Sequence, residues 1–298
     1  MFSGLSAFPL TPTHDGAVDF AAYRRTVSVA ALAGADSIGA LGSTGSYAYL
    51  NRDERAAVAR AAVTAAGPVP VIVGVGAFST SSVLEHVEDA AMAGAAGVLL
   101  PAISYQPLRD AEVYGLFEDV TSRFPEMPVV LYDNPATTGF TFSDDLRVSV
   151  AHLPSVVSIK LNTIPDGHDA ASEYVEMLRG LVPEGVSIGI SGDGASARGL
   201  LAGCDVWYSV LGGTFPGICQ QLTAAALSGD DVGAREMSAR LDPIWALFAK
   251  YGSFRVTAAL ATLSGSLPTD AVYAPVRPLS GSEREEVATA LRAIDLLE

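Results

Sequence analysis

Two kinds of segment alternate about eight times along this chain of 298 residues. Short runs rich in β-branched and aliphatic residues are each followed by an alanine-rich stretch whose apolar residues recur at helical spacing. The expected strands span residues 5–10, 37–41, 69–75, 97–100, 129–132, 156–161, 187–191 and 206–211. The expected helices span residues 20–33, 52–66, 81–93, 110–123, 143–151, 170–181, 195–202 and 220–227. Eight strand-then-helix units without a break in composition predict an α/β fold, a (β/α)8 TIM barrel.

The chain is longer than the roughly 250 residues of a typical barrel of this kind. We therefore expect a catalytic barrel over residues 1–228 and a C-terminal helical extension over residues 229–298. Within the extension, helical patterns occupy about 230–250, 254–264 and 281–297. A doubly wound open sheet is the alternative fold, although such a sheet does not normally need eight parallel strands.

Charge and composition restrict the partners and the compartment. A formal net charge of -15 argues against nucleic acid, which requires clustered Lys and Arg. No run approaches the ~18 apolar residues that span a bilayer, and the start of the chain has no basic region followed by an apolar one. Cys204 and Cys219 are too few for a disulfide framework. We expect a cytoplasmic protein that binds neither nucleic acid nor membrane.

Lysine usage identifies the first candidate for chemistry. The chain has two lysines, Lys160 and Lys250, against 16 arginines. Arginine stays protonated and cannot form a Schiff base, whereas a desolvated lysine can lose its proton and attack a carbonyl. Lys160 ends the sixth expected strand, on the face where such barrels carry their active sites. A lysine that forms a salt bridge at a strand end is the alternative interpretation, and Lys250 is expected in an exposed helix.

Other strand ends provide a candidate anion site and a candidate proton carrier. Ser43 and Thr44, between two glycines after the second strand, offer hydroxyls and backbone N–H groups to a carboxylate or phosphate, or cap the next helix. Tyr132 ends the fifth strand and either relays protons or packs over the barrel. Glycines after the last two strands leave a phosphosugar enzyme as an alternative, because many barrels bind phosphate there. The negative charge of Asp193 in the same loop disfavours a phosphate. The four histidines have no metal-ligand spacing.

These residues resemble the dihydrodipicolinate synthase and N-acetylneuraminate lyase family of pyruvate-dependent class I aldolases. The resemblance covers nearly the whole chain. Its ordered motifs are Phe8-Pro9-Leu10-Thr11-Pro12, Gly42-Ser43-Thr44-Gly45, Tyr132-Asp133-Asn134-Pro135 with Thr138-Gly139, Val156-Val157-Ser158-Ile159-Lys160 and Ser191-Gly192-Asp193. The family implies a (β/α)8 barrel with a helical extension, usually a homotetramer, that acts on a small 2-oxo acid. It also implies that no metal, nicotinamide or pyridoxal cofactor is needed.

The resemblance assigns roles to particular residues. It implies that Lys160 forms the imine, that Tyr132 relays protons, and that Ser43 and Thr44 bind the carboxylate beside the ketone. Tyr208 corresponds to the position whose backbone lines the pyruvate pocket.

Three positions depart from the family pattern. Ser46 replaces the Glu that usually follows the Gly-Thr-Thr-Gly motif. Thr137 stands where the synthases carry the Arg that grips the distal carboxylate of aspartate semialdehyde. Tyr105 matches only loosely the Tyr that reaches in from a neighbouring subunit. Synthase activity is therefore expected to be poor.

Three functions remain open from the sequence. The leading one is a Schiff-base lyase, aldolase or hydro-lyase that acts on pyruvate or another 2-oxo acid through Lys160. The alternative within the family is 4-hydroxy-tetrahydrodipicolinate synthase. The alternative from another class is a non-catalytic ligand-binding barrel that has kept the lysine without turnover.

Overall fold

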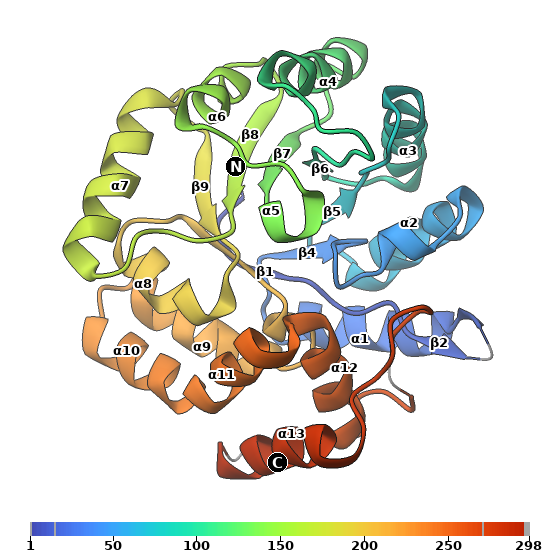
Figure 1. Cartoon of the computed structure of the whole chain (residues 1–298), viewed down its shortest axis with the longest axis vertical. Helices are drawn as coiled ribbons and strands as arrows, with labels where there is room; N and C mark the ends of the chain where they lie inside the picture. The colour runs from blue at the N-terminus through green and yellow to red at the C-terminus, as the bar shows by residue number, and fades with distance from the viewer. Residues whose placement is uncertain (1, 15, 270, 295–298) are drawn as a thin grey trace.

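Eight parallel strands close into a barrel in the computed structural model, which describes residues 2–14, 16–269 and 271–294 (Figure 1). Around the barrel the strands follow the order β1-β10-β9-β8-β7-β6-β5-β4. The barrel strands are β1 (Gly4–Ala7), β4 (Ser37–Ala40), β5 (Val71–Gly74), β6 (Gly97–Pro101), β7 (Val129–Asp133), β8 (Val156–Leu161), β9 (Ser187–Ile190) and β10 (Val206–Ser209). The closed barrel confirms the predicted fold class and rules out the open sheet.

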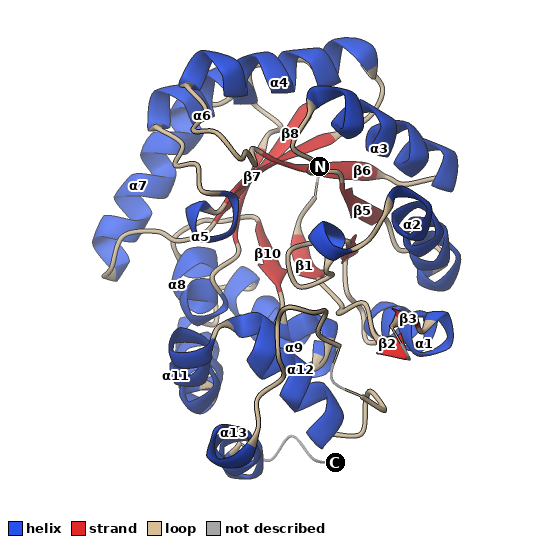
Figure 2. Ribbon diagram, turned by 45° about the vertical axis from the view of Figure 1, so that its right-hand side comes forward, coloured by secondary structure: helices blue, strands red, loops and turns tan. Residues whose placement is uncertain are grey.

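Helices follow the strands in turn and cover the outside of the barrel, as Figure 2 shows with strands in red and helices in blue. These helices are α1 (Phe20–Leu32), α2 (Arg52–Ala66), α3 (Thr80–Ala93), α4 (Asp110–Arg123), α6 (Asp144–Ala151), α7 (His168–Leu181), α8 (Ser196–Leu201) and α9 (Pro216–Leu227). Each overlaps the helix expected from periodicity. No helix in the described ranges is both long enough and apolar enough to cross a membrane.

Several short elements escaped prediction because they have no periodicity of their own. They are the hairpin of β2 (Thr13–His14) and β3 (Ala17–Val18), the one-turn helix α5 (Pro135–Thr138), and the 3-10 helices η1 (Tyr47–Tyr49), η2 (Asp193–Ala195) and η3 (Leu211–Gly213). Since α5, η2 and η3 directly follow barrel strands, they belong to the loops that shape the catalytic face.

The described part of the C-terminal region contains one more helix than predicted. It comprises α10 (Asp231–Arg240), α11 (Asp242–Tyr251), α12 (Ser253–Leu263) and α13 (Gly281–Ala293). The single helix expected over 230–250 is wrong. One helix ends before Leu241, and a second begins just after it with Pro243 in its first turn. Proline has no N–H to continue the preceding helix but is accepted at the start of a new one. The expected end of the last helix, residues 295–297, lies outside the described residues.

Side chains facing into the barrel form a core separate from the layer between strands and helices. This interior cluster contains Phe2, Phe8, Ile72, Leu99, Val130, Tyr132, Val206 and Tyr208. Successive residues of a strand point to opposite faces, so Val130 and Tyr132 face inward while Val129 and Leu131 pack against the helices. The sequence also predicts a boundary at residue 228 between a barrel unit and an extension unit. This division into two units stays a prediction.

A β-bulge between β7 and β8 sets the register at the centre of the barrel. Val129 pairs with Val156, but Val130 pairs with Ser158, so one residue of β8 is skipped. Val157 packs against the interior cluster, and the hydroxyl of its neighbour Ser158 also reaches the interior residue Tyr208. A bulge is a recurrent way to re-aim side chains near active sites.

Candidate active site

A cleft of about 580 Å³ opens at the carboxyl ends of the barrel strands. Its walls come from the loop after β4, from the ends of β7 to β10, and from α11 and α12. The lining residues are Ser43, Tyr132, Asn134, Ala136, Thr137, Lys160, Asn162, Thr163, Ser191, Gly192, Asp193, Gly194, Ala195, Val210, Trp245, Phe248, Ala249 and Ser253. The cleft therefore brings together Lys160, Tyr132, Ser43 and Thr137, which the sequence places on different segments.

Lys160 occupies the inner end of this cleft and is only 4% exposed. Its Nζ lies 4.2 Å from the ring centre of Phe8, 4.4 Å from that of Tyr132 and 5.7 Å from that of Tyr208. Burial lowers the pKa of Lys160 below its ordinary 10.5, and the nearby Tyr132 and Asp193 offset this only in part. A lowered pKa populates the neutral amine, the form that attacks a carbonyl.

Two aromatic side chains support Lys160 from within the barrel. Glycine at position 39 leaves room for the Phe8 ring, because a Cβ there would collide with it, and glycine at position 189 does the same for Tyr208. The Tyr208 hydroxyl lies 2.6 Å from Ser158 Oγ, and its side chain is fully buried. Tyr208 thus packs below the lysine and is not part of the cleft lining; whether its backbone contacts a substrate stays a prediction.

The Tyr132 hydroxyl is the meeting point of three polar side chains. Asn134 donates from Nδ2 at 2.9 Å, while longer bonds of 3.4 Å join the hydroxyl to Ser43 Oγ and Thr137 Oγ1. Burial raises the pKa of Tyr132, but the charge of Lys160 and these hydrogen bonds together outweigh burial and lower it. A phenol with a lowered pKa gives up its proton more readily, which suits a proton relay.

The register created by the bulge places Tyr132 directly beside Lys160, its partner on the neighbouring strand. Continuous pairing from Val129 and Val156 would instead set Tyr132 opposite Ile159, whose side chain faces the helices. Since neighbouring residues in register point to the same face of a sheet, the bulge is what brings the phenol and the amine into one cleft.

The loop after β4 is held in an unusual backbone conformation. Leu41 and Ser46 have φ values of 56° and 63°, in the left-handed region that costs non-glycine residues energy. The Thr11 hydroxyl donates to the carbonyl of Gly45 at 2.8 Å and fixes the loop. Ser43 reaches the cleft, whereas Thr44 is 2% exposed and lies outside the lining, with its buried hydroxyl unpaired within the described residues.

Asp193 ties together the loops after β9 and β10. Its carboxylate accepts hydrogen bonds from Trp207 Nε1 at 2.8 Å and from the backbone N–H of Leu211 at 2.9 Å. Burial raises the pKa of Asp193 to about 6, although these hydrogen bonds act in the opposite direction. Because this acid occupies the place of a barrel phosphate site and the lining adds no Arg there, the phosphosugar alternative loses its support.

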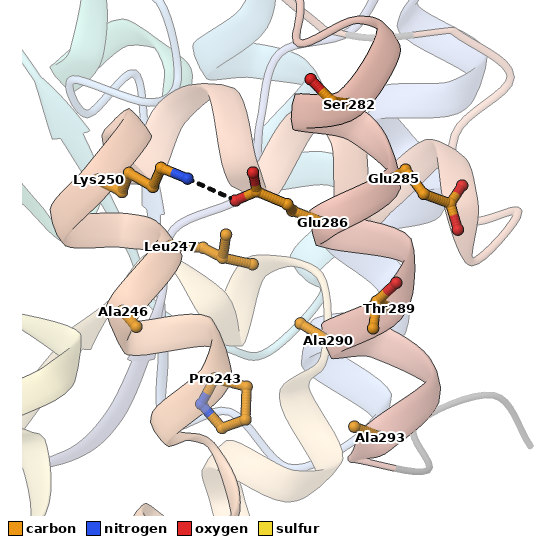
Figure 3. Close-up of a pocket in the computed structure, with 10 residues that line it drawn as sticks. All are labelled: Pro243, Ala246, Leu247, Lys250, Ser282, Glu285, Glu286, Thr289, Ala290 and Ala293. Atoms are coloured by element: carbon orange, nitrogen blue, oxygen red, sulfur yellow. Dashed lines mark hydrogen bonds and ion pairs between the residues drawn. The ribbon is translucent and has the colours of Figure 1, made fainter.

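The remaining candidates lie away from the cleft. Tyr105 is 88% exposed and does not line the cleft of its own chain. Lys250 lies in α11, as expected for an exposed helix, and pairs with Glu286 of α13 at 2.7 Å in an open groove of about 620 Å³ (Figure 3). No group of three or more His, Cys, Asp or Glu side chains within the described part of the chain is arranged to hold a metal ion.

Several site residues were missed by sequence reasoning. Asn134 belongs to a motif that carries the family resemblance, and its place two residues after Tyr132, at the N-cap of α5, was a usable signal. Phe8 belongs to a motif quoted for the resemblance, but its place beneath Lys160 was not anticipated. Trp245 and Phe248 gave no signal at all, since nothing in the sequence shows that α11 reaches the cleft.

Comparison with known proteins agrees with this geometry. The model of the dihydrodipicolinate synthetase family matches residues 1–294. A protein named 4-hydroxy-tetrahydrodipicolinate synthase from Thiobacillus denitrificans is 33% identical over 293 residues, covering 97% of this chain and 95% of its own. One of the same name from Azoarcus sp. is 30% identical, covering 98% of each chain.

Solved structures show the same similarity. The crystal structure of dihydrodipicolinate synthase from Agrobacterium tumefaciens superimposes with a TM-score of 0.94 at 38% identity and covers 99% of this chain and 98% of that one. The structure of the Thermotoga maritima enzyme of that name superimposes with a TM-score of 0.92 at 26% identity and covers 100% of both chains.

Proposed function

Because this chain belongs to the dihydrodipicolinate synthetase family and is therefore an enzyme of the lyase and aldolase type, we propose that Lys160 forms a Schiff base with pyruvate or another 2-oxo acid. The observation that carries the proposal is the position of Lys160. It is buried at the catalytic end of the barrel, beside Tyr132, with its pKa lowered by burial.

The proposed chemistry uses the residues of the inner cleft. Neutral Lys160 attacks the ketone carbon of the 2-oxo acid, and loss of water gives a protonated imine. That imine accepts an electron pair, which permits a carbon–carbon bond to form or break at the adjacent carbon, or water to leave. Tyr132 carries the protons, and its contacts with Ser43, Asn134 and Thr137 hold the phenolic oxygen in place.

The loop after β4 is proposed to bind the carboxylate of the 2-oxo acid. Ser43 lines the cleft, and Thr44 has a buried hydroxyl that no described residue pairs with. A hydrogen bond to a charged group contributes about 1.5–3 kcal/mol. Ser43→Ala and Thr44→Val should each weaken 2-oxo acid binding by about 10-fold or more, as measured by calorimetry with pyruvate. Ser149→Ala, at an exposed site on α6, should change nothing, and unaltered affinity in both loop variants would refute the assignment.

The reaction named for the relatives is the second candidate, and Thr137 opposes it. A distal carboxylate would meet a hydroxyl here instead of a guanidinium. We expect condensation of pyruvate with aspartate semialdehyde to run at least ~10-fold below an Arg-bearing relative for each ~1.4 kcal/mol of lost transition-state contact. Thr137→Arg should raise this rate. Thr137→Val, which keeps the size of the native threonine but adds no charge, should not. A wild-type rate equal to that of an Arg-bearing relative would favour the synthase.

We further propose a cytoplasmic homotetramer with a barrel over residues 1–228 and an extension over residues 229–298. In such an assembly Tyr105, which is 88% exposed in the single chain, would be free to contact a neighbouring subunit.

A further inference from the structure

The outer half of the cleft has almost no charge. Among the described residues that line it, Lys160 has the only cationic side chain and Asp193 the only acidic one. The imine uses Lys160, and the Asp193 carboxylate is already bound by Trp207 and Leu211. A carboxylate on the second substrate would therefore be taken from water without a charged partner, which is costly.

Two aromatic side chains of α11, Trp245 and Phe248, line this uncharged region and form an aromatic wall. The rings of Trp245 and Phe248 on α11 lie 5.7 Å apart, tilted by 59°. Trp245 Nε1 donates to the carbonyl of Ser238 at 3.2 Å, so the polar atom of the indole is satisfied within the protein. What the two rings offer to the cleft is apolar surface, with the small side chains of Ala136 and Ala249 also in the lining.

We propose that this part of the cleft selects an uncharged aldehyde whose flat apolar group, such as an aromatic ring, packs against Trp245 and Phe248. The proposal rests on imine formation at Lys160. Sugar-like hydroxyls set against the two rings would lose their bonds to water there. A polyhydroxylated aldehyde would then depend on the polar lining residues Asn162, Thr163, Ser191 and Ser253, and it fits the two rings less well than an apolar group does.

The reaction balances without any external oxidant or reductant. Tyr132 takes a proton from the carbon next to the imine, which gives an enamine. The enamine carbon attacks the aldehyde carbonyl and forms one carbon–carbon bond, and the imine is restored. The aldehyde oxygen takes up a proton delivered by Tyr132. Water then hydrolyses the restored imine, which frees Lys160 and releases a 4-hydroxy-2-oxo acid; cleavage is the reverse.

The test compares three aldehydes at saturating pyruvate: benzaldehyde, glyceraldehyde and aspartate semialdehyde. We expect kcat/KM to be at least 10-fold higher for benzaldehyde than for either of the others. Trp245→Ala should raise the KM for benzaldehyde at least 10-fold, and Phe248→Leu should raise it less. Phe78→Ala, at an exposed aromatic site outside the cleft, is the matched control. A preference for glyceraldehyde or aspartate semialdehyde would overturn the proposal.

A binding measurement separates this proposal from the proposed function. Benzyl alcohol, which cannot react, should bind the wild-type protein and lose at least 10-fold in affinity in Trp245→Ala. If benzyl alcohol binds in this way but pyruvate is not trapped on Lys160, the proposed function fails and the outer site stands. If pyruvate is trapped but benzyl alcohol binding does not depend on Trp245, the outer site fails alone.

Discussion

Borohydride reduction in the presence of pyruvate should add one pyruvate-derived mass per chain on Lys160 and none on Lys250. Lys160 is buried at the strand end with a lowered pKa, whereas Lys250 is exposed and paired with Glu286. Since the chain has only these two lysines, peptide mass mapping can assign the label to one of them or to the N-terminal amine. A non-catalytic barrel with an unreactive lysine would take up no label.

Two matched variants sharpen this experiment. Lys160→Arg keeps a positive charge but cannot form an imine, so labelling should disappear while the circular dichroism spectrum is retained. Lys250→Arg should be labelled like the wild type. The rate of trapping should rise with pH and level off below pH 10.5, because a lowered pKa makes neutral Lys160 available at lower pH. Label on Lys250, or none on either lysine, would contradict the mechanism.

Turnover should fall by roughly 10²- to 10⁴-fold in Tyr132→Phe, which removes a single hydroxyl from the centre of the site. That hydroxyl accepts from Asn134 at 2.9 Å and lies within 3.4 Å of Ser43 and Thr137, so its loss removes the proposed carrier between the cleft and the substrate. Steady-state kcat with the preferred aldehyde is the measurement.

Tyr23→Phe provides the control for this substitution. Tyr23 is also fully buried, and its hydroxyl has no partner within the described residues, but it lies outside the cleft. Its loss should leave kcat near the wild-type value. A Tyr132→Phe enzyme that turns over normally, with its fold intact by circular dichroism, would return Tyr132 to a packing role.

Hydrophobic periodicity predicted the barrel because burial imposes an apolar pattern on each strand and each helix separately. A strand covered on both faces reads as a short apolar run such as residues 129–132, and a helix on the barrel surface needs one apolar stripe, as residues 52–66 show. One-turn elements such as α5 (Pro135–Thr138) lack such a stripe and were missed. The break at Leu241 was missed because the apolar pattern continues across it, although Pro243 marks the new helix start.

The sequence by itself determined the chemistry available to the cleft. Two lysines limit where a Schiff base can form, and Thr137 stands where the family resemblance predicts an Arg, while no Arg is among the described residues that line the cleft. Strand ends were enough to bring Lys160, Tyr132 and Ser43 to one face, because all parallel strands of a barrel end on the same side.

Only the tertiary structure decided how these groups meet. The skipped residue in β8 sets Tyr132 beside Lys160, and no local pattern announces it, because a bulge depends on how two strands fit together. The fully buried environment that lowers the pKa of Lys160 comes from Phe8, Tyr132 and Tyr208 on three different strands or their ends. The aromatic side chains of Trp245 and Phe248 come from α11, and Trp245 lies about 85 residues after Lys160 in the chain. Only packing brings such distant residues together, because local propensity does not connect them.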